Sequence, residues 1–487
     1  MLLIMQKQLI LFVLIFNSLK AWSYLDLNKS RGSQVITSSQ NERCFIPQKF
    51  PAIDPQKIKN NYSENDLETE LELCQVDTNI QQPLIRNTQS AYAVGLCPKL
   101  HNTNPGLELY EIPEITNKND LEKVICDQTS SLRDASKLAK YKISTSCSYT
   151  PSILAYYHVS RILGGLLDVP PAVLKTLQAE EYKKTVLKGQ KTLAKGGTIA
   201  LTWKNLLKQL SSPTADKRGP YLFTTDSKQV YGALLKNIKN EAAFAEISND
   251  SGGEQIARAK DFMKEQVYLD LINSKQASQI ISTDWNQANV QKLQLMADAS
   301  DMLMIDYMLR QEDRFNNIAY KVEITGIANN EIKTVQSKKA DDLEKITKAQ
   351  EKFKELYPNA NAFPVKRIIL KDNDCGVAVE NGVARTSIVA ELKMLDPLKH
   401  IKKSTYDQIQ RFAGVMNSSN TAQFTKDFFM NETTMTANDY TRFQNNTKTL
   451  AETIKLKCQK GLLFLDLDLD QHFIAKAMHS LSLCDVK

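Results

Sequence analysis

The spacing of hydrophobic residues changes along the chain and separates a strand-rich part from a helix-rich part. Short apolar runs at 91–100, 107–112 and 137–143 alternate with polar residues or are bounded by turn-forming residues, which predicts strands. From about 175 to 310 the pattern is mostly that of helices. Before the first strand the pattern is weak, apart from a short acidic helix predicted at 64–73.

One helix has clear signals at both ends. Thr150 is a good N-cap, Pro151 suits the first helical position, and Gly164 suits the stop. The apolar segment that follows, 166–173, contains two adjacent prolines. Proline donates no backbone hydrogen bond, so this segment is predicted to be an extended linker or an edge strand.

Helix and strand signals then follow one another toward the C-terminus. Helices are predicted at 299–310 and 336–357, and strands at 318–324 and 365–370. Asn381-Gly382 predicts a hairpin turn, with strands at Cys375–Val379 and Val383, and the remainder is predicted to be helical. This order of elements is typical of an α+β protein with two lobes.

Composition and charge narrow the class of protein. The chain has 487 residues, 42% of them hydrophobic and 24% charged, which excludes a collagen-like chain, a coiled-coil rod and a wholly disordered protein. The net charge of +7 is small for this length and the charges are interspersed. We therefore expect no nucleic-acid partner.

The first residues have the pattern of a secretory signal. Lys7 precedes the apolar run Leu9–Phe16, and Ala21 is a plausible cleavage point. The run is short for a membrane span, and a retained anchor is the alternative. No later stretch has transmembrane length, so we expect an exported protein with no integral membrane segment after removal of residues 1–21.

Eight cysteines agree with an oxidising compartment, where disulfides form. Five of them lie between Cys44 and Cys147, and Cys458 and Cys484 lie near the C-terminus. We expect bonds within each cluster, with Cys458–Cys484 as one pair. The chain has no CxxC, HExxH, GxSxG, GxGxxG or GxxxxGK[ST] motif, which argues against zinc, α/β-hydrolase, Rossmann and P-loop chemistry.

Two other polar features are expected to be structural. His158 lies on the predicted helix after Thr150 and is expected to be a packed or capping residue rather than a ligand. Leu465–Asp470 alternates strictly between leucine and aspartate, which predicts a half-exposed strand with solvated carboxylates rather than a calcium site.

A polar loop after the helix at 299–310 carries candidate catalytic groups: Asp313, Arg314, Asn316 and Asn317 lie together in it. An Asp followed closely by an Asn is what phosphoryl transfer needs. The Asp can orient the attacking hydroxyl and accept its proton, while the Asn can ligate a metal ion bound to ATP.

A second acidic loop follows the strand at 365–370. Asp374-Cys375-Gly376 has the form Asp-x-Gly. An Asp at the end of a strand can hold Mg²⁺ or Mn²⁺ against nucleotide phosphates, because hard cations prefer oxygen ligands. Asp372 is an alternative ligand in the same loop.

These segments together resemble atypical kinases. The stretch Asp306–Asn317 resembles the D-x-x-x-G-N-x-D-R-H-x-x-N catalytic loop of the phosphatidylinositol kinases, the HipA-type kinases and the secretory-pathway (Golgi casein kinase) family. Arg161–Gly164, followed by Val169-Pro170-Pro171, is similar to the end of the regulatory helix and the strand leading to the adenine-binding hinge in the secretory-pathway family. The resemblance covers about 137–173 and 302–379.

The resemblance implies a two-lobed protein-kinase-like fold. A signal peptide at 1–21 and an irregular segment at 22–90 would precede a small β-containing N-lobe at 91–175 and a larger, mostly helical C-lobe at 176–487. It also implies ATP with Mg²⁺ or Mn²⁺ as cofactor, and a hydroxyl of a protein, glycan or lipid as acceptor.

Carried over residue by residue, the resemblance makes Asp313 the catalytic carboxylate and Asp374 a metal ligand. Asn317 matches the second metal ligand best, with Asn316 as the neighbouring candidate at the nucleotide. Lys140 is the best match to the strand lysine that contacts the phosphates. Lys142 is the alternative.

The sequence also departs from the family pattern. Phe315 replaces the usual His, and Ser152 and Ile153 stand where the secretory-pathway kinases carry a metal-linked Glu. No glycine-rich phosphate loop is apparent. Two alternatives to an active kinase therefore stay open: a non-catalytic binding protein on a kinase-like scaffold, and an exported structural or interaction protein with an unrelated α+β fold.

Overall fold

The protein is described by a computed structural model that forms two compact units. It describes residues 24–51, 58, 60–80, 92–99, 104–111, 118–126, 137–145, 147–192, 197–212, 221–238, 241–247, 254–315, 317–377 and 387–475. The predicted signal peptide, Asn316, the turn Asn381-Gly382 and Cys484 lie outside these residues. Unit 1 comprises residues 1–47, 72–148 and 173–234, and unit 2 comprises residues 48–71, 149–172 and 235–487.

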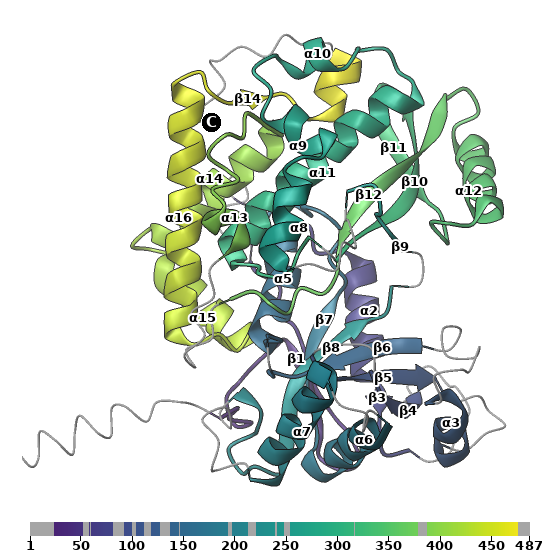
Figure 1. Ribbon diagram of the computed structural model, residues 1–487, viewed down its shortest axis with the longest axis vertical. Coiled ribbons are helices and arrows are strands. Elements are labelled where there is room, and N and C mark those ends of the chain that lie inside the picture. The colour runs from purple at the N-terminus through teal and green to yellow at the C-terminus, as the bar shows by residue number, and fades with distance from the viewer. Residues whose placement is uncertain are drawn as a thin grey trace, which may run out of the picture. The chain divides into compact units, whose positions relative to one another are not determined.

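Unit 1 is built on an eight-stranded, mostly antiparallel sheet with the order β1-β2-β7-β8-β6-β5-β4-β3 (Figure 1). Its strands are β1 Gln34–Thr37, β2 Arg43–Ile46, β3 Val76–Asp77, β4 Tyr92–Pro98, β5 Gly106–Glu111, β6 Lys137–Lys142, β7 Ala172–Gln178 and β8 Gln229–Lys236. The three strands predicted between residues 91 and 143 are therefore confirmed as β4, β5 and β6.

The prediction of a linker or edge strand at 166–173 is right for 166–171, which lie outside the named strands, and strand β7 begins at Ala172. Both prolines precede Ala172, so they remove no hydrogen bond from the strand that follows. That strand lies in the sheet interior, between β2 and β8. The edge-strand alternative is therefore wrong for Ala172 and Val173, which lie on a central strand.

The described part of unit 1 also contains the helices α3 Lys118–Ile125, α6 Ala179–Thr192 and α7 Gly197–Ser211. Helices α6 and α7 pack on each other, and Gly189 permits their close approach. A Cβ atom at Gly189 would lie 2.7 Å from the ring of Trp203, which is fully buried.

Disulfides confirm part of the cysteine prediction. Cys44–Cys74 and Cys97–Cys126 both join cysteines of the N-terminal cluster. Cys147, Cys375 and Cys458 are disulfide-bonded as well. None of the cysteines in the described part of the chain is free.

Unit 2 is mainly helical. Its longer helices are α5 Thr150–Ile162, α11 Gln287–Leu309, α12 Leu343–Leu356, α14 Lys403–Asn417, α15 Ala422–Glu432 and α16 Ala437–Gln459. Shorter helices are α8 Gln255–Phe262, α9 Gln266–Leu271, α10 Ala277–Ile280 and α13 Ile388–Glu391. The acidic helix predicted at 64–73 is α2 Glu64–Cys74, which passes from unit 2 into unit 1.

The central helix of unit 2, α11, begins earlier than the sequence predicted. Its N-cap is Asn286, whose side chain accepts a hydrogen bond from the Asn289 amide. The predicted span 299–310 is only its most apolar part. Figure 1 shows α11 running through unit 2 with α14 and α16 beside it.

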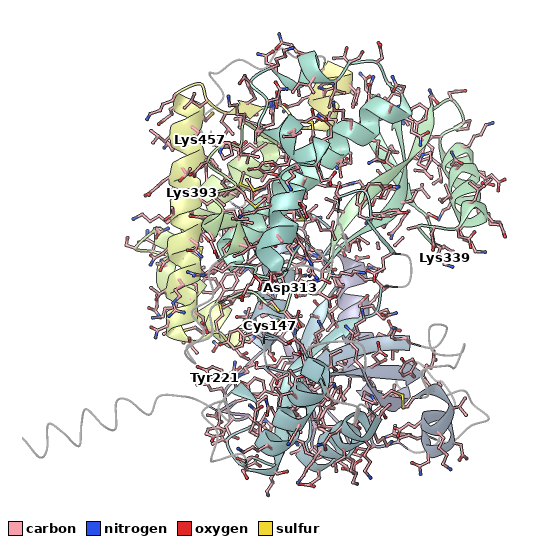
Figure 2. All side chains as sticks on the ribbon, viewed as in Figure 1. Cys147, Tyr221, Asp313, Lys339, Lys393 and Lys457 are labelled. Atoms are coloured by element: carbon pink, nitrogen blue, oxygen red, sulfur yellow. A yellow bond between two sulfur atoms is a disulfide. The ribbon has the colours of Figure 1, made fainter. Side chains whose placement is uncertain are left out.

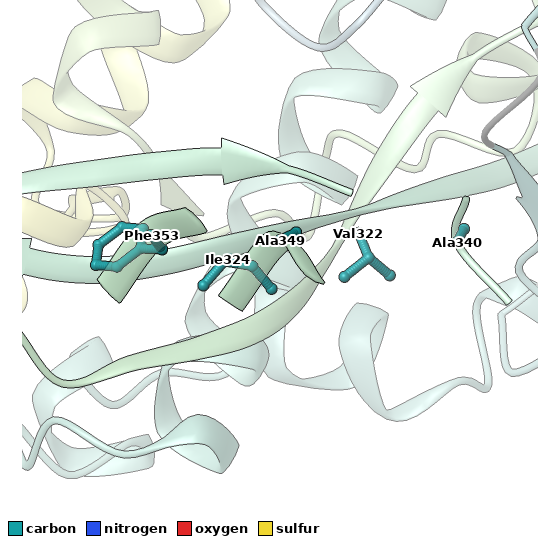
Figure 3. Close-up of a cluster of buried hydrophobic side chains, with 5 residues drawn as sticks. All are labelled: Val322, Ile324, Ala340, Ala349 and Phe353. Carbon is teal, nitrogen blue, oxygen red and sulfur yellow. The ribbon is translucent and has the colours of Figure 1, made fainter. Parts of the chain in front are cut away.

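A four-stranded sheet carries helix α12 on one face. Its strands are β9 Ala242–Ala243, β10 Ile318–Ala328, β11 Glu331–Gln336 and β12 Ala362–Leu370. Figure 3 shows Ala349 and Phe353 of α12 against Val322 and Ile324 of β10, with Ala340 beside them. This apolar contact attaches the charged helix to the sheet.

The predicted helix at 336–357 therefore starts too early. The Asp342 side chain accepts a hydrogen bond from the Lys345 amide and sets the start of α12, whereas Glu331–Gln336 pairs with β10. The predicted strand at Cys375–Val379 is also absent from the residues described there, 371–377.

The expectation of solvated carboxylates at Leu465–Asp470 is wrong for Asp466. Only Phe464–Leu465 forms strand β14, which pairs with β13 His400–Ile401. Asp466 is buried and accepts hydrogen bonds from the Ala277 amide at 2.7 Å and from His400 Nδ1 at 2.9 Å. Across the described ranges, no helix has the length and hydrophobicity needed to cross a membrane.

Candidate active site in unit 2

The first acidic loop begins where α11 ends. Arg310 adopts a left-handed conformation, with φ of 57°, and the Gln311 amide donates to the Asp306 carbonyl at 2.9 Å. The Gln311 side-chain oxygen then accepts from the amides of Glu312 at 3.0 Å and Asp313 at 3.2 Å. The backbone at Asp313 is therefore held immediately after the helix, where Figure 2 labels this residue.

A completely buried ion pair anchors this loop to α11. Arg314 donates through Nε to Asp306 Oδ2 at 2.8 Å and through Nη2 to Oδ1 at 3.0 Å. Tyr156 of α5 donates its hydroxyl to the same carboxylate at 2.6 Å. Bidentate geometry and additional donors compensate the cost of burying both charges. Arg314, which the sequence grouped with the candidate catalytic residues of the loop, is therefore a buried structural brace.

The same guanidinium reaches the second acidic loop. Nη1 of Arg314 donates to the Lys371 carbonyl at 2.8 Å, and Nη2 donates to Asn373 Oδ1 at 2.7 Å. Asn373 in turn donates to the carbonyl of Leu370, the last residue of β12, at 2.8 Å. One arginine thus fixes both loops relative to each other.

Helix α5 clamps the Asp-x-Gly segment from another direction. Ser152 Oγ donates to the Asn373 carbonyl at 2.6 Å and accepts from the Gly376 amide at 3.1 Å. A Cβ atom at Gly376 would lie 2.7 Å from Ser152 Oγ and 2.8 Å from the Leu309 carbonyl. The glycine is required because only hydrogen fits there.

Two carboxylates of the second loop act electrostatically on Asp313 of the first. Burial raises the pKa of Asp313, and the negative charges of Asp374 and Asp372 raise it further. Arg258 and Arg314 oppose this effect. Side chains that influence one another in this way lie within a few ångströms to about a nanometre. Asp374 is only 3% exposed, so the negative charge is concentrated in a partly dehydrated site.

Asn317 supports the first loop and retains a possible ligand atom. Its Nδ2 donates to the Asp313 carbonyl at 3.0 Å, and its backbone amide donates to the Arg314 carbonyl at 2.8 Å. Because Nδ2 is used within the loop, Oδ1 is the side-chain atom suited to a cation. Oxygen donors from carboxylates and an amide fit Mg²⁺ or Mn²⁺.

The other residues considered in the sequence analysis lie on different elements. Lys140 and Lys142 lie on β6 of unit 1, where Lys142 is 3% exposed and Lys140 is partly buried opposite Glu108. Their role at phosphates stays a prediction. Cys375 is disulfide-bonded, so it offers no thiolate to a metal. His158 is fully buried and hydrogen-bonded to Tyr62, which confirms its packing role.

Sequence reasoning missed the partners that position the site. Asp306 lies among apolar, buried residues near the end of α11, and a carboxylate in such surroundings signals a buried cation. That signal does not identify Arg314 as the cation, because Arg310 also follows within a few residues. Ser152 gave no comparable signal, because serine is common at helix starts.

Comparison with known proteins identifies no related family or curated protein. No family model matches this sequence, and no curated protein matches it either.

Proposed function

We propose that this protein is an exported kinase-like enzyme that transfers the γ-phosphoryl group of ATP to a hydroxyl of a protein, glycan or lipid. One observation carries the proposal: Arg314 holds two loops together, and the charges of Asp372 and Asp374 in the second loop act on Asp313 in the first. Like charges repel, so a fold that fixes them this way favours a cationic ligand.

In this proposal Asp313 orients the acceptor hydroxyl and takes its proton. The hydroxyl oxygen forms a bond to the γ-phosphorus, the bond to the bridging oxygen breaks, and ADP leaves. Burial and neighbouring carboxylates raise the pKa of Asp313, which makes it a better proton acceptor than an ordinary aspartate.

Asp374 and the Oδ1 atom of Asn317 would hold Mg²⁺ or Mn²⁺, with Asp372 as the alternative ligand. The cation, when bound, neutralises phosphate charge. The family resemblance assigns the phosphates to Lys140 or Lys142, and the two-lobed kinase arrangement belongs to the same proposal. Disulfides agree with export, because they persist in oxidising compartments.

A non-catalytic binding protein on the same scaffold is the second candidate, and Ser152 favours it. In the resembling family a Glu stands at this part of the helix, whereas the Ser152 hydroxyl here is occupied by the Asn373 carbonyl and the Gly376 amide. The described part of α5 thus clamps the loop without supplying a carboxylate.

Calorimetry of ATP binding in the presence of Mn²⁺ tests the proposal. We expect the purified protein to bind ATP only with the cation, and Asp374→Asn to abolish binding without unfolding the protein. Asp341→Asn, at an exposed residue before α12, is the matched control and should bind as the wild type does. Absence of binding to the folded wild type with either Mg²⁺ or Mn²⁺ would exclude both kinase-like candidates.

A further inference from the structure

Helix α8 lies against the candidate catalytic loop. Phe262, the last residue of α8, is 2% exposed, and its ring contacts that of Phe315 with 4.9 Å between centroids. Phe315 follows Asp313 by two residues. The aromatic contact therefore fixes one face of α8 beside the loop.

Arg258 lies on that same face, because it precedes Phe262 by four residues on the helix. Its side chain is partly buried. The Nε atom is buried and has no hydrogen-bond partner among the residues that the structure describes. A buried donor without a partner costs free energy unless a ligand supplies an acceptor.

Three buried or partly buried arginines of unit 2 are paired with carboxylates. Arg161 binds Asp66, Arg314 binds Asp306 and Arg367 binds Asp298, each through two nitrogen atoms. The charge of Arg258 acts on Asp313 and lowers its pKa, but the structure records no hydrogen bond from Arg258 to a carboxylate in the part it describes. This guanidinium stands beside the acidic site rather than being neutralised within it.

We propose that Arg258 is a further catalytic residue, which donates hydrogen bonds to the γ-phosphoryl group of ATP while that group is transferred. The inference rests on the proposed function. A guanidinium presents several donors in one plane and matches phosphate oxygens. Arg258 would stabilise the negative charge on the phosphoryl oxygens while Asp313 accepts the proton of the hydroxyl.

Nucleotide affinity tests this role without knowledge of the acceptor. The dissociation constants of ADP and of a non-hydrolysable ATP analogue are measured with Mn²⁺ for the wild type, Arg258→Ala and Arg258→Lys. We expect Arg258→Ala to weaken the ATP analogue about 10- to 100-fold, because charge-assisted hydrogen bonds to the γ-phosphoryl group are lost. ADP lacks that group, so its affinity should change by less than about threefold.

Two variants make the result specific. Arg258→Lys keeps the charge but not the planar donors, so we expect a smaller loss for the ATP analogue and none for ADP. Lys260→Ala removes a cation from the exposed face of the same helix and should leave both affinities unchanged. Circular dichroism shows whether each variant is folded. If Arg258→Ala is not folded, the affinities of Arg258→Lys are compared with those of the wild type instead.

The other results would contradict either the role of Arg258 or the proposed function. Equal losses for ADP and the ATP analogue, or no loss for either, would show that Arg258 does not contact the γ-phosphoryl group, while the nucleotide site itself would stand. Failure of the wild type to bind both nucleotides would overturn the proposed function and, with it, this role.

Discussion

Unit 2 contains two groups of buried or partly buried aspartates that are treated in opposite ways. Along α11, Asp298 is bound by Arg367, Asp301 by Lys402 and Asp306 by Arg314. In the loops beyond α11, burial is the main cause of the raised pKa of Asp313, and the next causes are two more carboxylates, Asp374 and Asp372. Each of the three helix aspartates forms an ion pair with an arginine or a lysine, whereas Asp313 lies in the field of two further carboxylates, an arrangement that suits a cation.

The contrast shows how one sequence separates stability from chemistry. A buried ion pair adds little net stability but is costly to break, so it fixes geometry. A cluster of like charges destabilises the ligand-free protein and is kept where a cation compensates it. Arg314 joins the two groups, because it pairs with a helix aspartate and positions the loop ones.

The largest effect is expected from breaking the brace. Arg314→Ala would leave the Asp306 carboxylate buried without its cation and should lower the free energy of unfolding by about 3–5 kcal/mol. Urea denaturation measures this change. Lys264→Ala, which removes an exposed pair with Asp261, should change it by less than about 1 kcal/mol. Similar small losses for both variants would mean that the brace does not organise the site.

A smaller loss is expected at the clamp on the second loop. Gly376→Ala places a methyl group against Ser152 Oγ and the Leu309 carbonyl, and overpacking of this kind costs about 1–3 kcal/mol. Gly414→Ala is the control, since no atom lies within 4 Å of a Cβ there. Thermal unfolding compares the two. Equal stability of both variants would contradict the close fit of Gly376.

Removing a loop charge should act in the opposite direction. Asp313→Asn relieves repulsion from Asp374 and Asp372, so the ligand-free variant should be as stable as the wild type or more stable, by up to about 1 kcal/mol. Asp298→Asn, by contrast, breaks a pair with Arg367 and should destabilise. Chemical denaturation without added cation checks both signs. Destabilisation by Asp313→Asn would place Asp313 among the structural aspartates.

The same contrast predicts a pH dependence. The pKa of Asp313 is higher in the folded protein than in the unfolded chain, where it lies near 4. The Asp313 carboxyl therefore contributes its full stabilisation at a pH below about 4, and this contribution is lost as the pH rises through the pKa of the folded state. The wild type should therefore lose stability relative to Asp313→Asn over that window. Denaturation of both proteins from pH 4 to 7 measures the difference, and parallel curves would contradict the raised pKa.

Local signals predicted much of the fold. Apolar runs located β4, β5 and β6, and Pro151 and Gly164 located α5, because these signals act within a few residues. The predicted N-cap Thr150 is wrong, since Tyr149 is the N-cap and Thr150 is already helical. The interior position of β7 was not predictable, since it depends on β2 and β8, which are distant in the sequence. Asp466 was misjudged for the same reason: its partners are His400 and the Ala277 amide.

The sequence indicated the types of residue in the candidate site, but it did not indicate the side chains that hold the two loops in place. Asp313 and Asp374 stand in segments whose composition is typical of phosphoryl transfer, and the structure places both in the same electrostatic environment. The brace from Arg314 to Asn373 and the clamp from Ser152 join residues that are far apart along the chain. Such contacts arise from tertiary packing, which no local pattern records.

The most direct test of the central claim is the anomalous scattering of manganese in crystals grown with Mn²⁺ and a non-hydrolysable ATP analogue. The account predicts a manganese peak within ligand distance of the Asp374 carboxylate, with Asn317 or Asp372 as a further ligand, and no such peak in Asp374→Asn. A well-ordered crystal with the cation elsewhere, or with none near the two acidic loops, would contradict the separation of structural and cation-binding aspartates.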